Sequence, residues 1–246
     1  MTLQVTVLGA SGTYAGPGGA CSGYLVQCDG FSLLVDAGPG TLANLQRHVS
    51  LRDLDAVIIS HEHPDHWLEL PVLRNAWKYA LDRAGVPVYG TAGTLAFADP
   101  LCHGELAPTF DWRVITDGDE LAIGPLTVRC SDTDHPPETL GLAIGDGATW
   151  LGYSADTGPG WSMSAFGVPI DLAIWEATCL DADKASVHGV HCSAAETGHE
   201  ARAAEVRRLV LTHLWPGSDP EDFRAEAAAT YGAPVDVAEP GAAYFP

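Results

Sequence analysis

Short apolar runs separated by Gly, Asp and Pro recur along the chain, and this pattern predicts a protein rich in β-strands. Turn-forming pairs such as Asp146-Gly147 lie between several of these runs. The predicted strands cover residues 2–8, 23–28, 31–35, 55–60, 86–90, 112–116, 120–123, 126–132, 140–144, 148–153, 170–176 and 208–212.

Fewer segments carry helix signals. The segment 71–84 begins with a proline, which suits a first helical turn, and ends before a glycine. A short helix is predicted near residues 91–99, and the stretch 100–112 lacks periodicity, so we expect a loop there near the entrance of the functional site. Capping boxes of the form Ser-x-x-Glu predict that two further helices begin at Ser193 and at Ser218.

Strands followed by helices occur twice along the chain, without a linker, a low-complexity segment or a sequence repeat between them. Two sheets packed face to face, with helices outside, would bury such elements. A chain of 246 residues is long enough for one sizeable core. We therefore predict one domain over residues 1–246, made of two similar halves.

The charge balance restricts the classes of partner. The chain has 32 Asp plus Glu against 12 Lys plus Arg, which gives a formal net charge of −20. Nucleic-acid binding normally relies on phosphate neutralisation by Lys and Arg, so we expect no extended nucleic-acid footprint. A small phosphate-bearing substrate is compatible with this charge, because bound metal ions can supply positive charge locally.

No apolar run approaches the ~20 residues that a membrane-spanning helix needs, and we expect no membrane partner. The N-terminal residues alternate like a first strand and do not resemble a signal peptide. The six cysteines form no CxxC pair and no disulfide frame. Together these features predict a cytoplasmic protein with reduced thiols.

The densest group of chemically active side chains is the run Ser-His-Glu-His-Pro-Asp-His at residues 60–66, directly after a predicted strand. His61 and His63, two residues apart, can chelate one cation, and one backbone turn can direct Asp65 and His66 toward a second. Three imidazoles and one carboxylate suit zinc better than calcium or magnesium, which prefer oxygen ligands. The run therefore predicts a zinc site, since a solvated turn rarely collects so many ligands.

A site for two cations needs further ligands and a carboxylate to bridge them. Such residues are expected at strand ends, and three candidates directly follow predicted strands. They are His135, Asp156 and His213.

These residues and their order resemble the metallo-β-lactamase-fold hydrolases. Asp36 after the second hairpin, the run 60–66, and then the three strand-end candidates match the ordered motifs of that superfamily across nearly the full length. The resemblance implies an α+β fold, a four-layer αββα sandwich, with two divalent metal ions at one edge of the sheets. Zinc is expected, with manganese and iron as alternatives. The implied ligands are His61, His63 and His135 on one ion, Asp65, His66 and His213 on the other, and Asp156 between them.

The segment His191-Cys192-Ser193 resembles the His-x-Ser/Thr segment of the ribonuclease Z branch of that superfamily. In that branch the corresponding histidine assists phosphodiester cleavage, which makes His191 the candidate for protonating the leaving oxygen. Asp65 is expected to orient the attacking water and take its proton. Asp36 is expected to orient a ligand histidine, and Glu176 to hydrogen-bond His191 or His213.

One departure from the branch bears on the substrate. Enzymes of the branch that process transfer RNA usually carry a long substrate-gripping arm between the third and fourth motifs, and this chain has room there only for a hairpin between His135 and Asp156. We therefore predict a dinuclear-metal-dependent hydrolase of a small or short phosphodiester. The alternatives are hydrolysis of a lactone, thioester or other ester, transfer-RNA 3′ processing, and a non-catalytic metal-binding sensor. By analogy with the branch, a homodimer is expected.

Overall fold

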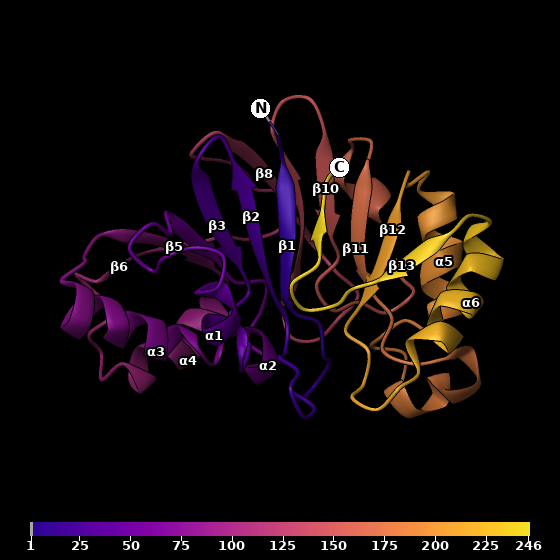
Figure 1. Ribbon diagram of the computed structural model, residues 1–246, viewed down its shortest axis with the longest axis horizontal. Coiled ribbons are helices and arrows are strands. Elements are labelled where there is room, and N and C mark those ends of the chain that lie inside the picture. Colours follow the sequence, from indigo (N-terminus) through magenta and orange to yellow (C-terminus); the bar gives the residue numbers. More distant parts are fainter. Residues whose placement is uncertain (1) are drawn as a thin grey trace.

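Two seven-stranded sheets lie against each other, and helices cover their outer faces (Figure 1). The computed structural model describes residues 2–246. The αββα sandwich predicted from the sequence is confirmed. Within the described residues, no helix combines the length and the apolar character needed to cross a membrane.

The first sheet has the strand order β14-β1-β2-β3-β4-β5-β6. Its strands are β1 (Gln4–Gly9), β2 (Gly23–Cys28), β3 (Phe31–Val35), β4 (Ala56–Ile58), β5 (Val86–Gly90), β6 (Phe110–Val114) and β14 (Ala243–Tyr244). The helices of this half are α1 (Thr41–Leu45), α2 (Pro64–Trp67), α3 (Leu70–Asn75), the π-helix η1 (Ala76–Leu81) and α4 (Ala92–Leu101).

The second sheet has the order β13-β12-β11-β10-β9-β8-β7. Its strands are β7 (Glu120–Ile123), β8 (Leu126–Asp132), β9 (Leu140–Gly145), β10 (Trp150–Tyr153), β11 (Leu172–Glu176), β12 (Leu209–Thr212) and β13 (Val235–Val237). The helices of this half are α5 (Ala194–Ala203), α6 (Pro220–Tyr231) and the 3₁₀ segments η2 (Met163–Phe166) and η3 (Asp181–Val187).

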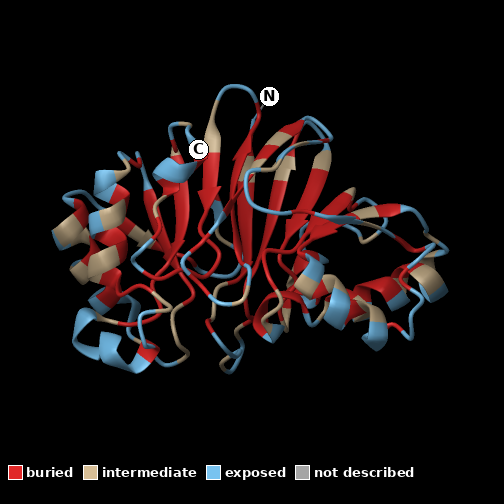
Figure 2. Ribbon diagram, turned by 180° about the vertical axis from the view of Figure 1, so that it is seen from behind, coloured by how far each residue is buried: buried red, intermediate tan, exposed pale blue. Residues whose placement is uncertain are grey.

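The residues of each strand divide between a central core, which lies between the sheets, and an outer core under the helices of that half, because successive side chains point to opposite faces of a sheet. In β2, Tyr24 and Val26 belong to the core between the sheets, while Leu25 packs under the helices of the first half. In β11, Ile174 lies between the sheets and Trp175 packs toward the helices of the second half. Figure 2 shows the central strands buried and exposure concentrated on the outer helices and loops. Burial on both faces explains why several strands read as continuous apolar runs.

Two predictions for the first half need correction. The helix predicted over 71–84 begins at Leu70 and changes to π-helical hydrogen bonding after Asn75, before Asp82 ends it in a left-handed conformation. The stretch 100–112 does not border the site. It starts in the last turn of α4 and leads to β6, the edge strand of the first sheet, and no residue of the stretch lines the pocket described below.

Of the two helix starts predicted for the second half, the one at Ser193 is confirmed and the one at Ser218 is wrong. Ser193 forms the predicted capping box, with its side chain and that of Glu196 each bonded to the other's backbone N–H. The box predicted at Ser218 is displaced by one residue, since Asp219 is the N-cap of α6 and accepts a hydrogen bond from the backbone of Glu221. The reason is Pro220, which suits the first helical position and restricts the residue before it to an extended, cap-like backbone.

Candidate metal centre

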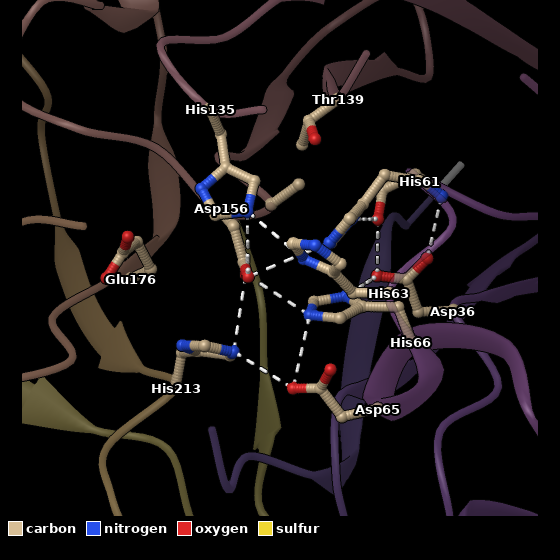
Figure 3. A network of polar contacts seen from close by, with 12 residues as sticks. Asp36, His61, His63, Asp65, His66, His135, Thr139, Asp156, Glu176 and His213 are labelled. Carbon is tan, nitrogen blue, oxygen red and sulfur yellow. Dashed lines mark hydrogen bonds and ion pairs between the residues drawn. The ribbon is translucent and has the colours of Figure 1, made fainter. Parts of the chain in front are cut away.

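The candidate ligands lie together at one edge of the sandwich, where strands of both sheets end (Figure 3). In the first sheet β3 and β4 run parallel, which places the residues that follow them side by side. In the second sheet β10, β11 and β12 are parallel and do the same. The carboxyl ends of parallel strands meet at one edge, so side chains distant in sequence converge there.

The chain turns sharply as several of these strands end. Asp36, Ala155 and His213 each adopt a left-handed backbone conformation, with φ of 57°, 51° and 64°. A non-glycine residue in this region is strained by roughly 1–3 kcal/mol, and such strain is typical of functional sites. Gly38 is required nearby, because a Cβ there would overlap the backbone oxygen of Asp65. The site is thus held by tight turns on a rigid sheet edge.

One group of ligand atoms comes from His61, His63, His135 and Asp156, all within 4.8 Å of one another. The Nε2 atoms of His61 and His135 lie 3.7 and 3.8 Å from Oδ2 of Asp156. Nδ1 of His63 lies 3.1 Å from Nε2 of His135. The group joins both halves of the chain, and it can hold one cation.

A second group consists of Asp65, His66 and His213, again with ligand atoms within 4.8 Å. Here the other carboxylate oxygen of Asp156 takes part, since Oδ1 lies 3.2 Å from Nε2 of His66 and 3.3 Å from Nε2 of His213. The two oxygens of Asp156 therefore face the two groups separately. This is the arrangement that a bridging carboxylate between two cations requires.

Three buried polar atoms at this site have no hydrogen-bond partner: Nε2 of His61, Nε2 of His66 and Oδ1 of Asp156. An unsatisfied buried donor or acceptor costs about 1–3 kcal/mol, more for a charged group. All three atoms point into the clusters, where a divalent cation would satisfy them together. The donor set of imidazoles and carboxylates fits such ions, so the residues present are suited to hold divalent metals.

The electrostatics of the clusters favour cation binding. Burial lowers the pKa of His61 well below its ordinary value, and this keeps the imidazole neutral. Burial opposes ionisation of Asp156, but His213 and His66 outweigh it and hold its pKa well below the usual range. His66 differs, because Asp156 and Asp36 raise its pKa despite burial. The raised pKa means that His66 also tends to bind a proton, and a metal ion would compete with a proton for its Nε2.

His191 lies over the clusters, and its ring stacks on that of His213 with centroids 5.4 Å apart. Its Nδ1 is 2.9 Å from Oε1 of Glu176, a carboxylate that is fully buried at the end of β11. Burial alone would lower the pKa of His191, but the hydrogen bond and the charge of Glu176 raise it to about 9. A protonated imidazole has no free lone pair for a cation, which favours a role for His191 beside the metals.

A pocket of about 410 Å³ opens onto this arrangement. Its lining residues are Thr13, His63, Pro64, Asp65, Asp156, His191 and His213. The lining contains no Lys or Arg. Of the predicted ligands, His61 and His66 are fully buried behind it. The eight predicted ligands and catalytic residues are thus brought together, and the other two predicted residues, Asp36 and Glu176, are hydrogen-bond partners of His66 and His191.

Several residues that contact the predicted ones were missed by the sequence reasoning, among them Thr13, Ser60 and Thr178. The backbone N–H of Thr13, in the β1–β2 loop, donates to Oδ2 of Asp65 at 2.8 Å. Hydroxyls of Ser60 and Thr178 lie against His61 and His213. Nothing in the sequence signals Thr13, because its contact is made by the backbone. The two hydroxyl residues could have been noticed, since Ser60 directly precedes a ligand and Thr178 lies two residues after Glu176.

Residues 32–214 match the beta-lactamase superfamily domain, which covers more than half of the chain. The chain belongs to this superfamily. It is 35% identical over 246 residues to an uncharacterized protein of Mycobacterium tuberculosis, covering 96% of this chain and 89% of that one. It is 28% identical over 269 residues to ribonuclease Z of Mycobacterium bovis, covering 96% of this chain and 95% of the relative.

A relative in Bacillus subtilis, the probable metallo-hydrolase YhfI, is 30% identical over 244 residues, with 97% of this chain and 98% of YhfI covered. The crystal structure of YhfI superposes with a TM-score of 0.91 at 28% identity over 100% of both chains. The superfamily protein described here is accordingly a metal-dependent hydrolase, and its His/Asp clusters could hold the metal ions.

Proposed function

We propose that this superfamily member is a dinuclear-metal-dependent phosphodiesterase that hydrolyses a small or short phosphodiester. The observation that carries the proposal is the placement of His191. It is held by Glu176, stacks on His213, and lines the same pocket as Asp65 and Asp156. A charged imidazole at this position can bind a phosphate oxygen and protonate the departing one.

Two divalent cations, with zinc as the expected metal, would be held by the two ligand groups, and Asp156 would contribute one oxygen to each. When bound, such ions supply positive charge and make an activated water available at neutral pH. Asp65 lines the pocket, and the Thr13 N–H donates a hydrogen bond to its Oδ2, which holds that oxygen in place. We assign to Asp65 the orientation of that water and the acceptance of its proton.

The size and charge of the pocket support a small substrate. Without Lys or Arg in its lining, the positive charge that meets a phosphate would come from the metals and His191 alone. The chain between His135 and Asp156 contains β9 and β10 joined by a tight turn, so this segment contains no protruding arm. The relative named ribonuclease Z supports phosphodiester chemistry, whereas the absent arm and the net charge of −20 disfavour transfer RNA as the substrate.

The decisive test compares substrates on one metal-loaded preparation. Metal content is measured first, and about two divalent ions per chain are expected. Turnover of bis-p-nitrophenyl phosphate, a p-nitrophenyl ester and a lactone is then compared for the wild type and for Asp156→Asn. We expect the highest kcat/KM for the phosphodiester and a loss of both metal and turnover in the variant. A higher kcat/KM for the ester or the lactone would replace the proposal with carbonyl hydrolysis.

A further inference from the structure

Two buried hydroxyl groups, Ser60 and Thr178, each lie between a carboxylate and a ligand histidine. Both residues are fully buried, with exposed fractions of 0%. Each hydroxyl is within hydrogen-bond distance of one carboxylate oxygen and of one imidazole nitrogen. The function described above uses neither side chain.

In the first half of the chain the carboxylate is Asp36. Its Oδ2 accepts hydrogen bonds from Nδ1 of His66 at 2.7 Å and from the Ser60 hydroxyl at 2.9 Å. The Ser60 oxygen is in turn 3.0 Å from Nδ1 of His61. Oδ1 of Asp36 accepts the backbone N–H of Ser60 at 2.8 Å, which fixes the geometry of the serine. Asp36 thus contacts one histidine directly and another through a hydroxyl.

The second half repeats this arrangement with Glu176. Oε1 of Glu176 accepts a hydrogen bond from Nδ1 of His191, and Oε2 accepts one from the Thr178 hydroxyl at 2.8 Å. The Thr178 oxygen is 2.9 Å from Nδ1 of His213. Oε2 also accepts the backbone N–H of Thr178 at 3.1 Å, as Asp36 does with Ser60. The two networks lie at corresponding strand ends of the two sheets, after β3 and at the end of β11.

In each network, only one arrangement of the protons among the carboxylate, the hydroxyl and the imidazole has low energy. A hydroxyl has one proton, and a carboxylate can only accept. If the hydroxyl donated to the imidazole, its lone pairs would face the carboxylate across 2.8–2.9 Å with no proton between them, in a buried site. The hydroxyl therefore donates a hydrogen bond to the carboxylate, and its oxygen accepts a hydrogen bond from the Nδ1–H group of the histidine. A neutral imidazole with its proton on Nδ1 carries its free lone pair on Nε2.

That free lone pair is directed at the metal clusters in both cases. Nε2 of His61 lies 3.7 Å from Oδ2 of Asp156, and Nε2 of His213 lies 3.3 Å from Oδ1. His135 reaches the same state without a hydroxyl, because its Nδ1 is 2.7 Å from the carbonyl oxygen of Val190, which can only accept. His135 therefore serves as an internal reference for the other two.

We propose that Ser60 and Thr178 are positioning residues that set the tautomers of His61 and His213, so that both imidazoles present Nε2 to the metal ions. The inference rests on the metal centre of the proposed function. It assigns to each half of the chain one carboxylate–hydroxyl pair that prepares one ligand on each cation. Hydrogen-bond partners of ligand histidines typically change metal affinity by 10–100-fold when removed.

The test uses the full-length, zinc-loaded protein and a matched pair of variants. Thr178→Val keeps the shape of the side chain and removes the hydroxyl, while Thr178→Ser keeps the hydroxyl. Ser60→Ala probes the other network. Long-range ¹⁵N–¹H correlation spectra identify which ring nitrogen of each histidine carries a proton, and chelator competition gives the zinc dissociation constants.

In the wild type we expect a proton on Nδ1 of His61, His135 and His213. Thr178→Val should weaken zinc binding at one site by about 10–100-fold and disturb the His213 signals, with His135 unchanged. Thr178→Ser should stay within about threefold of the wild type, since an unaltered network loses no hydrogen bond. Ser60→Ala should affect His61 in the same way and leave His213 unchanged.

A proton on Nε2 of His213 or His61 in the wild type would overturn the inference, whatever the variants do. Equal zinc affinity in Thr178→Val and Thr178→Ser would do the same for Thr178. Failure of the proposed function is separable from these outcomes. Absence of phosphodiester turnover would contradict the substrate assignment while the tautomers remained as expected, and the same spectra can be recorded on zinc-free protein if no zinc binds.

Discussion

At the scale of single residues, the two carboxylates that matter most at the site have different tasks. Asp156 has both oxygens directed at the ligand clusters, and its position follows from the sharp turn at Ala155. Glu176 does not line the pocket. It holds His191 in place by a hydrogen bond, and its carboxylate stabilises the protonated imidazole. The role assigned to His191, protonation of the leaving oxygen, therefore matters most for leaving groups that cannot depart without a proton.

His191→Ala should slow phosphodiester hydrolysis to a degree that depends on the leaving group. Proton donation by a positioned side chain typically contributes about 10²–10⁴-fold, and a poor leaving group such as an alkyl alcohol needs it fully. p-Nitrophenolate leaves readily without a proton, so the loss should be much smaller for bis-p-nitrophenyl phosphate. Measuring kcat for a methyl and a p-nitrophenyl phosphodiester in both proteins checks this. An equal loss for both would contradict the role as proton donor.

At the scale of elements, the helices illustrate which local signals were sufficient. The capping box of α5 was recognised because both of its residues lie within one helical turn. The start of α6 was misplaced because Ser218 fits the same pattern, although Pro220 directs the chain so that Asp219 becomes the cap. The elements β13, β14 and α1 went unpredicted, since so few residues show no period.

The corrected cap of α6 leads to a comparison of two neighbouring substitutions. Asp219→Ala removes the side chain that accepts the Glu221 N–H, and loss of an N-cap costs about 1 kcal/mol. Ser218→Ala should change the free energy of unfolding by less than about 0.5 kcal/mol, as surface changes away from such features do. Urea denaturation of both variants distinguishes the two caps. The opposite order of stabilities would restore the capping box first predicted at Ser218.

The contact between α5 and α6 depends on a glycine. A Cβ at Gly198 would overlap the backbone oxygen of Ala227 and the side chain of Thr230. Overpacking typically costs about 1–3 kcal/mol, and alanine gains about 1 kcal/mol in helix propensity over glycine. Gly198→Ala should therefore lower the free energy of unfolding by a net amount of up to about 2 kcal/mol. The exposed neighbour His199→Ala is the control and should be close to neutral in the same denaturation experiment; stabilisation by Gly198→Ala would show that the helices can separate without cost.

At the scale of the whole molecule, the ligands of each proposed cation come from both halves of the chain. His61, His63, Asp65 and His66 follow β4 of the first sheet, and the remaining ligands follow strands of the second. Metal binding would therefore connect the two sheets across their edge, and it would add to the apolar core between them. The single domain over residues 1–246 stays a prediction with a direct thermal test.

Zinc-loaded protein should unfold in one cooperative transition, and removal of metal should lower the Tm. A ligand at 1,000 times its dissociation constant stabilises the folded state by about 4 kcal/mol. For a chain of this size each kcal/mol shifts the Tm by roughly 2–4 °C, so a decrease on the order of 10 °C is expected. Calorimetry with and without a chelator measures it. Two separate transitions in the zinc-loaded protein would instead mean that the halves unfold as independent domains.

From the sequence, apolar runs were enough to predict the central strands, and the spacing within residues 60–66 together with the strand-end positions of His135, Asp156 and His213 was enough to name candidate ligands. The αββα class and the assignment of these ligands to two cations came from the resemblance of the ordered motifs to the metallo-β-lactamase fold. Three features came from the packing of the two sheets: which oxygen of Asp156 faces which cluster, the distance of the stretch 100–112 from the pocket, and the contacts by which Ser60 and Thr178 connect carboxylates to histidines. Such contacts join residues from separate strands, and their distances are set by how the two sheets pack, which no local pattern encodes.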